Sequence, residues 1–215
     1  MTQQAESIVR AANILFENGV MSHTGHANLS ARLGADSMLL TIDGQVRNLT
    51  ADRVATVGLD GVVREGDLDP TNAEIIAMHS EIYKLRSDVG GIIHTHSPSL
   101  LAFAMANQAL PCRYEALLRW GQSVDVPVAT WAPRGSDKSV SAIIDQAKAH
   151  PETKAVILGN HGVLVFASDP VATAQLLTVL EEAAEAELAA IGLGGAQSLP
   201  ESALAAIRES MARVR

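Results

Sequence analysis

The stretch "GGIIHTHSPSLLAFA", residues 90–104, places two histidines at the end of a short apolar run. Small and β-branched residues followed by Ser-Pro predict a buried strand, on which side chains two residues apart point to the same face. His94 and His96 should therefore project together. Because bare imidazoles inside a sheet are costly, we expect a ligand or hydrogen-bond partners to satisfy them. Ser97 and Pro98 suit the N-cap and first position of a helix that follows.

Helix and strand patterns alternate on both sides of this stretch. Apolar residues at helical spacing predict helices over residues 3–18, 71–86, 98–107, 136–150 and 171–191, with Gly19 ending the first of them. Short apolar or alternating runs predict strands within 23–34, 37–44, 54–65, 126–132, 154–160 and 162–167, with a hairpin at Asp60-Gly61. The interleaving predicts one α/β domain over residues 1–215, with a central mixed, mostly antiparallel sheet and helices on both faces.

The composition narrows the functional classes. The chain has 215 residues, a formal net charge of −8 and no clustered Lys or Arg, so we expect no nucleic-acid partner. No apolar run approaches the ~20 residues of a membrane span, and the N-terminus lacks a signal-peptide pattern, which favours the cytoplasm. Cys112 is the only cysteine, and we interpret it as a core or interface residue rather than a nucleophile.

Three of the seven histidines end predicted strands. His94, His96 and His161 stand in "HTH" and "GNHG", whereas His79 lies inside a helical pattern, as core histidines do, and His150 ends one. Three neutral imidazoles that converge on one point suit zinc or another transition metal, with a coordination position left open. A pair of hydrogen-bonded histidines near the surface is the alternative explanation for the H-x-H pattern.

The order of "GHANLSAR", "LLTIDG", "PTNAEIIAMHSEIYKLRSDV", "GGIIHTHSPSLLAFA", "RYEALL" and "LGNHGVLVFA" resembles the class II aldolase/adducin family along almost the whole chain. The resemblance implies a divalent metal, usually zinc with Mn²⁺, Fe²⁺ or Co²⁺ also possible, held by His94, His96 and His161. It also implies Glu74 as the acid/base that closes the resting metal site. The family forms homotetramers with active sites between subunits, and Tyr114 matches a tyrosine that protonates an aldehyde oxygen in the neighbour's site.

The glutamate departs from the family pattern by one residue. Glu74 stands five residues before His79, where aldolases of the family typically have four. Because the fifth residue adds a further rotation of about 100° to a four-residue spacing that returns nearly to the same helix face, Glu74 must precede the helix or lie beside a bulge to face the metal. A helix N-terminal acidic residue is the alternative interpretation, and Glu115 is the reserve carboxylate.

The family's phosphate pocket is altered as well. Asn28 and Ser30 remain, but Asp43-Gly44 replaces a hydroxyl residue and glycine, and Asn72-Ala73 replaces a serine pair. A carboxylate near a phosphate dianion is repulsive, so we predict a substrate whose end is a carboxylate or uncharged; Asp43 as an ordinary turn residue is the alternative. Arg113 or Arg119 could bind a carboxylate. The tail after residue 199 also lacks the aromatic residue that closes the site in some aldolases of the family.

We therefore predict a metal-dependent lyase that cleaves a C–C bond of a small hydroxy-ketone or hydroxy-acid through an enediolate. Epimerisation passes through a similar intermediate. Decarboxylation of an aromatic or keto acid on the same fold is the second hypothesis. A non-catalytic adducin-like scaffold and an iron-dependent oxygenase are alternatives from other classes.

Overall fold

The computed structural model describes residues 2–213. Strand β5 (Gly91–Thr95), which carries His94, lies in the middle of a mixed sheet. Within the described residues the sheet has eight strands in the order β4-β3-β2-β1-β5-β8-β7-β6. The other strands are β1 (Ala27–Leu33), β2 (Ser37–Thr41), β3 (Val54–Gly58), β4 (Val63–Glu65), β6 (Val128–Ala129), β7 (Ala155–Leu158) and β8 (Gly162–Ala167). All pairings are antiparallel except β6 with β7, which confirms the predicted mixed, mostly antiparallel sheet.

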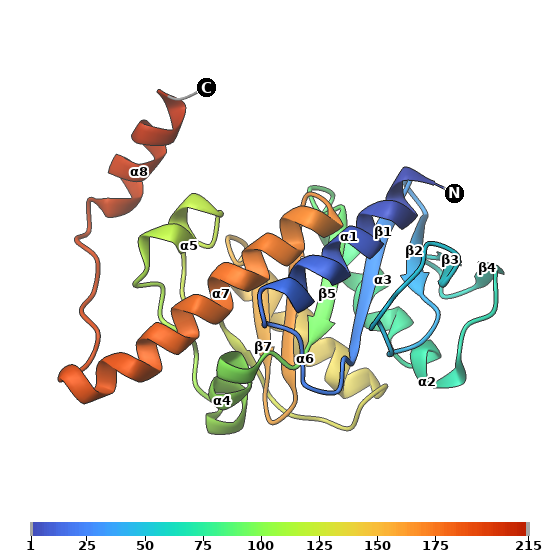
Figure 1. Cartoon of the computed structure of the whole chain (residues 1–215), viewed down its shortest axis with the longest axis horizontal. Coiled ribbons are helices and arrows are strands. Elements are labelled where there is room, and N and C mark those ends of the chain that lie inside the picture. Colours follow the sequence, from blue (N-terminus) through green and yellow to red (C-terminus); the bar gives the residue numbers. More distant parts are fainter. Residues whose placement is uncertain (1, 214–215) are drawn as a thin grey trace.

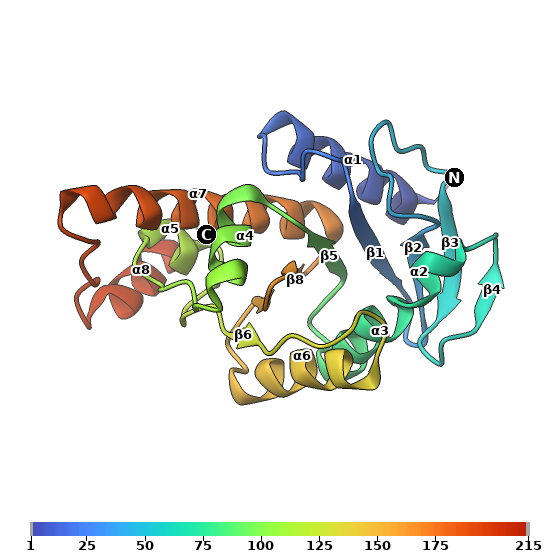
Figure 2. The same ribbon diagram turned by 90° about the horizontal axis from the view of Figure 1, so that it is seen from below.

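Helices cover both faces of the sheet, as Figures 1 and 2 show. One face packs against α1 (Gln3–Glu17), α4 (Pro98–Ala106) and α7 (Pro170–Ala190), and the other against α3 (Ile76–Leu85) and α6 (Asp137–Ala149). Strands β2, β5 and β7 are buried along their whole length because each is covered on both sides. The fold is the single-domain α/β layered architecture that the sequence predicts, while its extent over residues 1–215 stays a prediction because residues 1, 214 and 215 lie outside the described part.

Most helix limits agree with the sequence patterns, and their caps explain why. The Thr2 side chain accepts a hydrogen bond from the Ala5 N–H at the start of α1, and Ser136 accepts one from the Ser139 N–H at the start of α6. Gly19 has φ +70°, the left-handed conformation expected just past a helix end. Three short elements were not predicted or only in part: α5 (Glu115–Arg119), the 3₁₀ turn η1 (Ile191–Leu193) and α8 (Ala203–Ala212).

The helix predicted over residues 71–86 is broken. It consists of α2 (Pro70–Ala73) and α3, separated by a turn at Glu74 and Ile75. The break absorbs the extra residue between Glu74 and His79, so Glu74 precedes α3 as its spacing required. The strand predicted over residues 126–132 is likewise only two residues long, because Pro127 and Pro133 cannot donate to a sheet ladder.

Within residues 2–213, every helix is too short or too polar to cross a lipid bilayer.

Candidate metal centre

Three histidine side chains meet where strands in the middle of the sheet end, and we call this group of strand ends the histidine edge. His94 and His96 come from the end of β5, and His161 comes from the turn between β7 and β8, where Asn160 adopts a left-handed φ of 54°. The ring centroid of His94 lies 5.2 Å from that of His96 and 4.7 Å from that of His161. The centroids of His96 and His161 are 5.1 Å apart. One ligand nitrogen from each ring lies within 4.8 Å of the other two. The fold thus brings together the three residues that the sequence singled out.

The imidazoles are prepared as neutral ligands. Burial lowers the pKa of His94 well below its usual value, with the neighbouring His161 and His96 adding to the effect, and burial lowers the pKa of His96 to about 4. His94 Nδ1 lies 3.0 Å from the carbonyl oxygen of Val163, which fixes Nδ1 as the protonated nitrogen and leaves the Nε2 lone pair free.

A metal ion fits this donor set. The Nε2 atom of His96 is buried and has no hydrogen-bond partner among the described residues. Three uncharged imidazoles, one of them with an orphaned nitrogen, match the three-histidine sets that hold Zn²⁺ and leave a coordination position for substrate. Among the described residues, this cluster of possible ligands contains the three histidines and no carboxylate.

A fourth imidazole, that of His26, was not singled out by the sequence reasoning. β1 pairs with β5 so that Asn28 lies opposite His94, and continuing this register places His26 opposite His96. The two rings stack with centroids 5.5 Å apart and planes 11° apart. A histidine two residues before an asparagine on the strand beside an H-x-H strand was the available signal, but it depends on knowing which strands pair.

Glu74, the predicted acid/base, forms an ion pair with Arg134. Its carboxylate is 3.3 Å from Nε of Arg134, and the same guanidinium donates a 2.6 Å hydrogen bond to the Thr71 carbonyl. The positive charge of Arg134 contributes to lowering the pKa of His26, His96 and His161, so it acts on three imidazoles at once. Arg134 lies in a loop without sequence pattern, and nothing in the sequence pointed to it.

Two of the predicted substrate-binding residues lie side by side at the same edge. Asn28 and Asn72 are fully buried, and the Asn28 side-chain amide donates to the Asn72 side-chain oxygen at 3.5 Å. Asn72 in turn donates to the Thr41 carbonyl at 2.8 Å. The side-chain oxygen of Asn28 is buried without a partner among the described residues, as expected of a group that faces a bound molecule.

Asp43 and Gly44 lie in a turn, the alternative that the sequence analysis left open for Asp43. Asp43 forms an ion pair with Arg53 and accepts a hydrogen bond from the Gln45 N–H at 2.9 Å, so its charge is compensated and it also closes a turn. Gly44 is needed for space, because a Cβ there would lie 2.2 Å from Cε1 of His26. The carboxylate repulsion expected from Asp43 is therefore offset by its partner.

Ser30 lies behind the histidine edge. It is fully buried, and its hydroxyl is 2.7 Å from Nδ1 of His79 and 2.9 Å from the Tyr83 hydroxyl. The role of Ser30 in substrate binding stays a prediction; in this structure its hydroxyl contacts two side chains on α3. His79 is the buried core histidine that the helical pattern indicated.

The residues of "RYEALLR" lie away from the histidines of their own chain. Tyr114 is exposed and donates a 3.2 Å hydrogen bond to Glu182 on α7, and Figure 1 shows α5 beside α7, away from the turn between β7 and β8. Arg113 pairs with Glu187, and Arg119 pairs with Glu115. Within one copy of the chain, neither the reserve carboxylate nor the two arginines are brought to the metal site.

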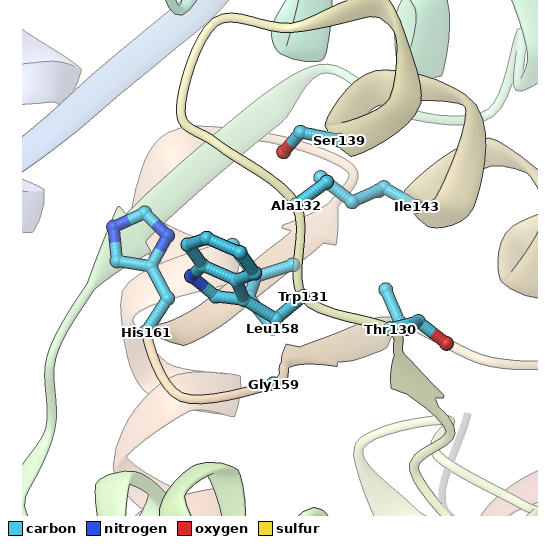
Figure 3. A pocket seen from close by; sticks show the side chains of 9 residues that line it. Thr130, Trp131, Ala132, Ser139, Ile143, Leu158, Gly159 and His161 are labelled. Atoms are coloured by element: carbon cyan, nitrogen blue, oxygen red, sulfur yellow. The ribbon is translucent and has the colours of Figure 1, made fainter.

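Two further residues complete the picture. Trp131 and His161 line one small pocket next to α6, as Figure 3 shows, and Trp131 is 59% exposed.

Cys112 is half-buried, its thiol donates to the Gln122 carbonyl at 3.2 Å, and burial raises its pKa to about 11. A thiol held protonated in this way is a poor nucleophile, in agreement with the sequence interpretation.

Comparisons with known proteins agree with this geometry. The profile of a family described as "Class II Aldolase and Adducin N-terminal domain" matches residues 6–188. The chain is 28% identical to a methylthioribulose-1-phosphate dehydratase from Marinobacter nauticus, over 75% of this chain and 81% of the relative. It is 29% identical to a 3-oxo-tetronate 4-phosphate decarboxylase from Haemophilus influenzae, over 85% of both chains.

Two further similarities extend over almost the whole chain. A 5-deoxy-D-ribulose 1-phosphate aldolase from Bacillus thuringiensis is 25% identical, over 94% of this chain and 92% of the relative. Among solved structures, an L-fuculose 1-phosphate aldolase superposes with a TM-score of 0.85 at 22% identity, covering 98% of this chain and 97% of that one, which shows a shared fold.

Proposed function

The chain belongs to the class II aldolase and adducin family, and from that premise we propose that it is a metal-dependent lyase acting on a small hydroxy-ketone or hydroxy-acid. The observation that carries the proposal is the set of three neutral imidazoles, His94, His96 and His161, with ligand nitrogens within 4.8 Å of one another. Zn²⁺ is our first candidate for the metal, and Mn²⁺, Fe²⁺ and Co²⁺ are accepted by the same ligands.

The bound metal would act as a Lewis acid that stabilises negative charge on a carbonyl oxygen while the neighbouring bond breaks. Side chains of the protein would transfer the protons and orient the substrate. We propose that Glu74 moves the proton between substrate and solvent, and that the buried Asn28 and Asn72, with the turn at Asp43 and Gly44, orient the end of the substrate distant from the reacting carbon. Tyr114 of a neighbouring copy would exchange a proton with the aldehyde oxygen.

We favour retro-aldol cleavage of a C–C bond, and decarboxylation is the second candidate because one of the relatives is named as a decarboxylase. Both reactions leave negative charge next to a carbonyl, so one site serves either. The retained set of three histidines speaks against a non-catalytic adducin-like scaffold.

One of the two sequence arguments against a phosphorylated substrate is weakened by the structure. The absence of hydroxyl groups from Asn72-Ala73 still supports an unphosphorylated substrate, but the charge of Asp43 is compensated by Arg53. Each of the three relatives described above is named for a phosphorylated compound. An unphosphorylated substrate stays our prediction, and matched substrates are needed to test it.

The test begins with metal analysis of protein purified without added metal, followed by assays on pairs of hydroxy-ketones and hydroxy-acids that differ only in a phosphate group. We expect one metal ion per chain and bond cleavage with a higher kcat/KM for the unphosphorylated member. Oxygen consumption with iron bound would indicate the oxygenase instead.

The control is His94→Ala, which should lose the metal and the activity but keep its fold, because the site lies at the histidine edge. Circular dichroism and size-exclusion chromatography check the fold. Stoichiometric metal in a variant with all three histidines replaced by alanine would contradict the assignment.

A further inference from the structure

Arg134 lies in a loop that reaches both the proposed acid/base and a metal ligand. Its guanidinium pairs with Glu74 at 3.3 Å and donates to the Thr71 carbonyl at 2.6 Å. Trp131 of the same loop lines one small pocket together with His161. One loop thus connects the proposed acid/base with the histidine edge.

The loop between β6 and α6 holds this arginine in place. Gly135 has φ +72°, and a Cβ on it would lie 3.0 Å from Cβ of Glu74, so the backbone packs directly onto the glutamate. Ser136 then caps α6 through the Ser139 N–H. The Ser136 hydroxyl also donates to the Pro133 carbonyl at 2.6 Å, which closes a turn around Arg134 and gives its backbone a defined position.

Glu74 is the present partner of Arg134, and the ion pair holds its carboxylate against the guanidinium. Yet the Arg134 side chain is 38% exposed, and the planar fork of a guanidinium can take a carboxylate from a bound molecule through two parallel hydrogen bonds. Arg113 and Arg119 pair with Glu187 and Glu115 and lie away from the histidines of their own chain.

We propose that Arg134 binds a carboxylate of the substrate and in doing so exchanges its ion pair with Glu74 for one with the substrate. The inference rests on the proposed function and narrows its substrate class to hydroxy-acids or keto acids whose carboxylate lies near the reacting carbon. Glu74 would then leave its ion pair with Arg134 only when the substrate carboxylate binds. Arg134 thereby replaces Arg113 and Arg119 as the carboxylate-binding residue.

The test uses two small chelators, glycolate and tartronate, titrated calorimetrically into the metal-loaded protein. Both offer a hydroxyl and a carboxylate to a metal, and tartronate carries one additional carboxylate. We expect the wild type to bind tartronate at least about 10-fold more tightly than glycolate, a difference typical of one charge-assisted pair. Arg134→Gln should lose most of this preference while its glycolate affinity stays within about twofold, and Arg134→Lys should keep part of it.

Glu74→Gln supplies an independent arm that leaves Arg134 intact. Because the competing carboxylate is gone, this variant should bind tartronate more tightly than the wild type, with little change for glycolate. An unaltered preference in Arg134→Gln, an equal loss of both ligands in that variant, or no gain in Glu74→Gln would each overturn the exchange. Failure of glycolate itself to bind the metal-loaded wild type would instead overturn the proposed function.

Discussion

Glu74 pairs with Arg134 and is not part of the cluster of possible metal ligands among the described residues, so metal binding and proton transfer can be tested separately. Glu74→Gln keeps the size of the side chain and loses its basicity. We expect turnover to fall by a factor of about 10² or more, while metal content measured by elemental analysis stays near that of the wild type. If Glu115→Gln produces this loss and Glu74→Gln does not, the acid/base role belongs to Glu115.

His79 makes the stability of the metal-free protein depend on pH. Burial lowers its pKa to about 3, below the ordinary value of 6.5, so the unfolded chain takes up a proton at a higher pH than the folded one does. The associated stability is therefore complete above pH 6.5 and is lost as the pH falls toward about 3.

His79→Gln should consequently be less stable than the wild type at pH 7 but lose less stability on acidification. Urea unfolding of the metal-free proteins between pH 5 and 7.5 measures this difference, with the exposed His150→Gln as the matched control. Because His79 contributes to lowering the pKa of His94, the difference between the two pH profiles reports His79 together with its effect on His94. Parallel profiles for wild type and His79→Gln would contradict the prediction.

At the scale of elements, α4 is capped from another helix and not by its own N-cap residue. The Ser97 hydroxyl donates to the Val20 carbonyl, and the buried carboxylate of Glu181 on α7 accepts from the N–H groups of Ser99 and Leu100 at 2.5 and 3.0 Å. This contact joins the helix after the H-x-H strand to the longest helix of the fold.

Glu181→Ala should therefore destabilise the protein by about 1–3 kcal/mol, because two buried N–H groups lose their acceptor. The midpoint and slope of a urea unfolding curve give the change, and Glu181→Gln, which keeps one acceptor oxygen, should lose less. A stability within 0.3 kcal/mol, roughly the error of such measurements, would show that water replaces the carboxylate without loss.

At the scale of the whole molecule, Tyr114 is far from the histidines of its own chain, and its hydroxyl meets Glu182. If the proposed homotetramer places Tyr114 in a neighbour's site, one functional site needs side chains from two copies. Tyr114→Phe and His94→Ala should each be inactive alone, yet a mixture dissociated and reassembled should regain part of the activity. Native mass spectrometry would follow the exchange, and mixed assemblies without activity would place the tyrosine outside the reaction.

Local sequence determined much of this protein. The alternation of helical and strand patterns predicted the layered fold, because burial imposes periods of 3.6 and 2 residues on any chain that packs against a sheet. The H-x-H spacing placed His94 and His96 on one face for the same reason. The one-residue offset of Glu74 even indicated a break before α3, since a regular helix could not present it.

Tertiary structure alone decided which side chains share the site. His26 joins His96 only because β1 pairs with β5 in one register, and the Ser30 hydroxyl contacts His79 and Tyr83, 49 and 53 residues away. Asp43 is compensated by Arg53, and Glu74 by Arg134 across 60 residues of chain that no local pattern connects. Periodicity reports which face of an element is buried, whereas a charge is governed by neighbours in space, and those are set only when the whole sheet has formed.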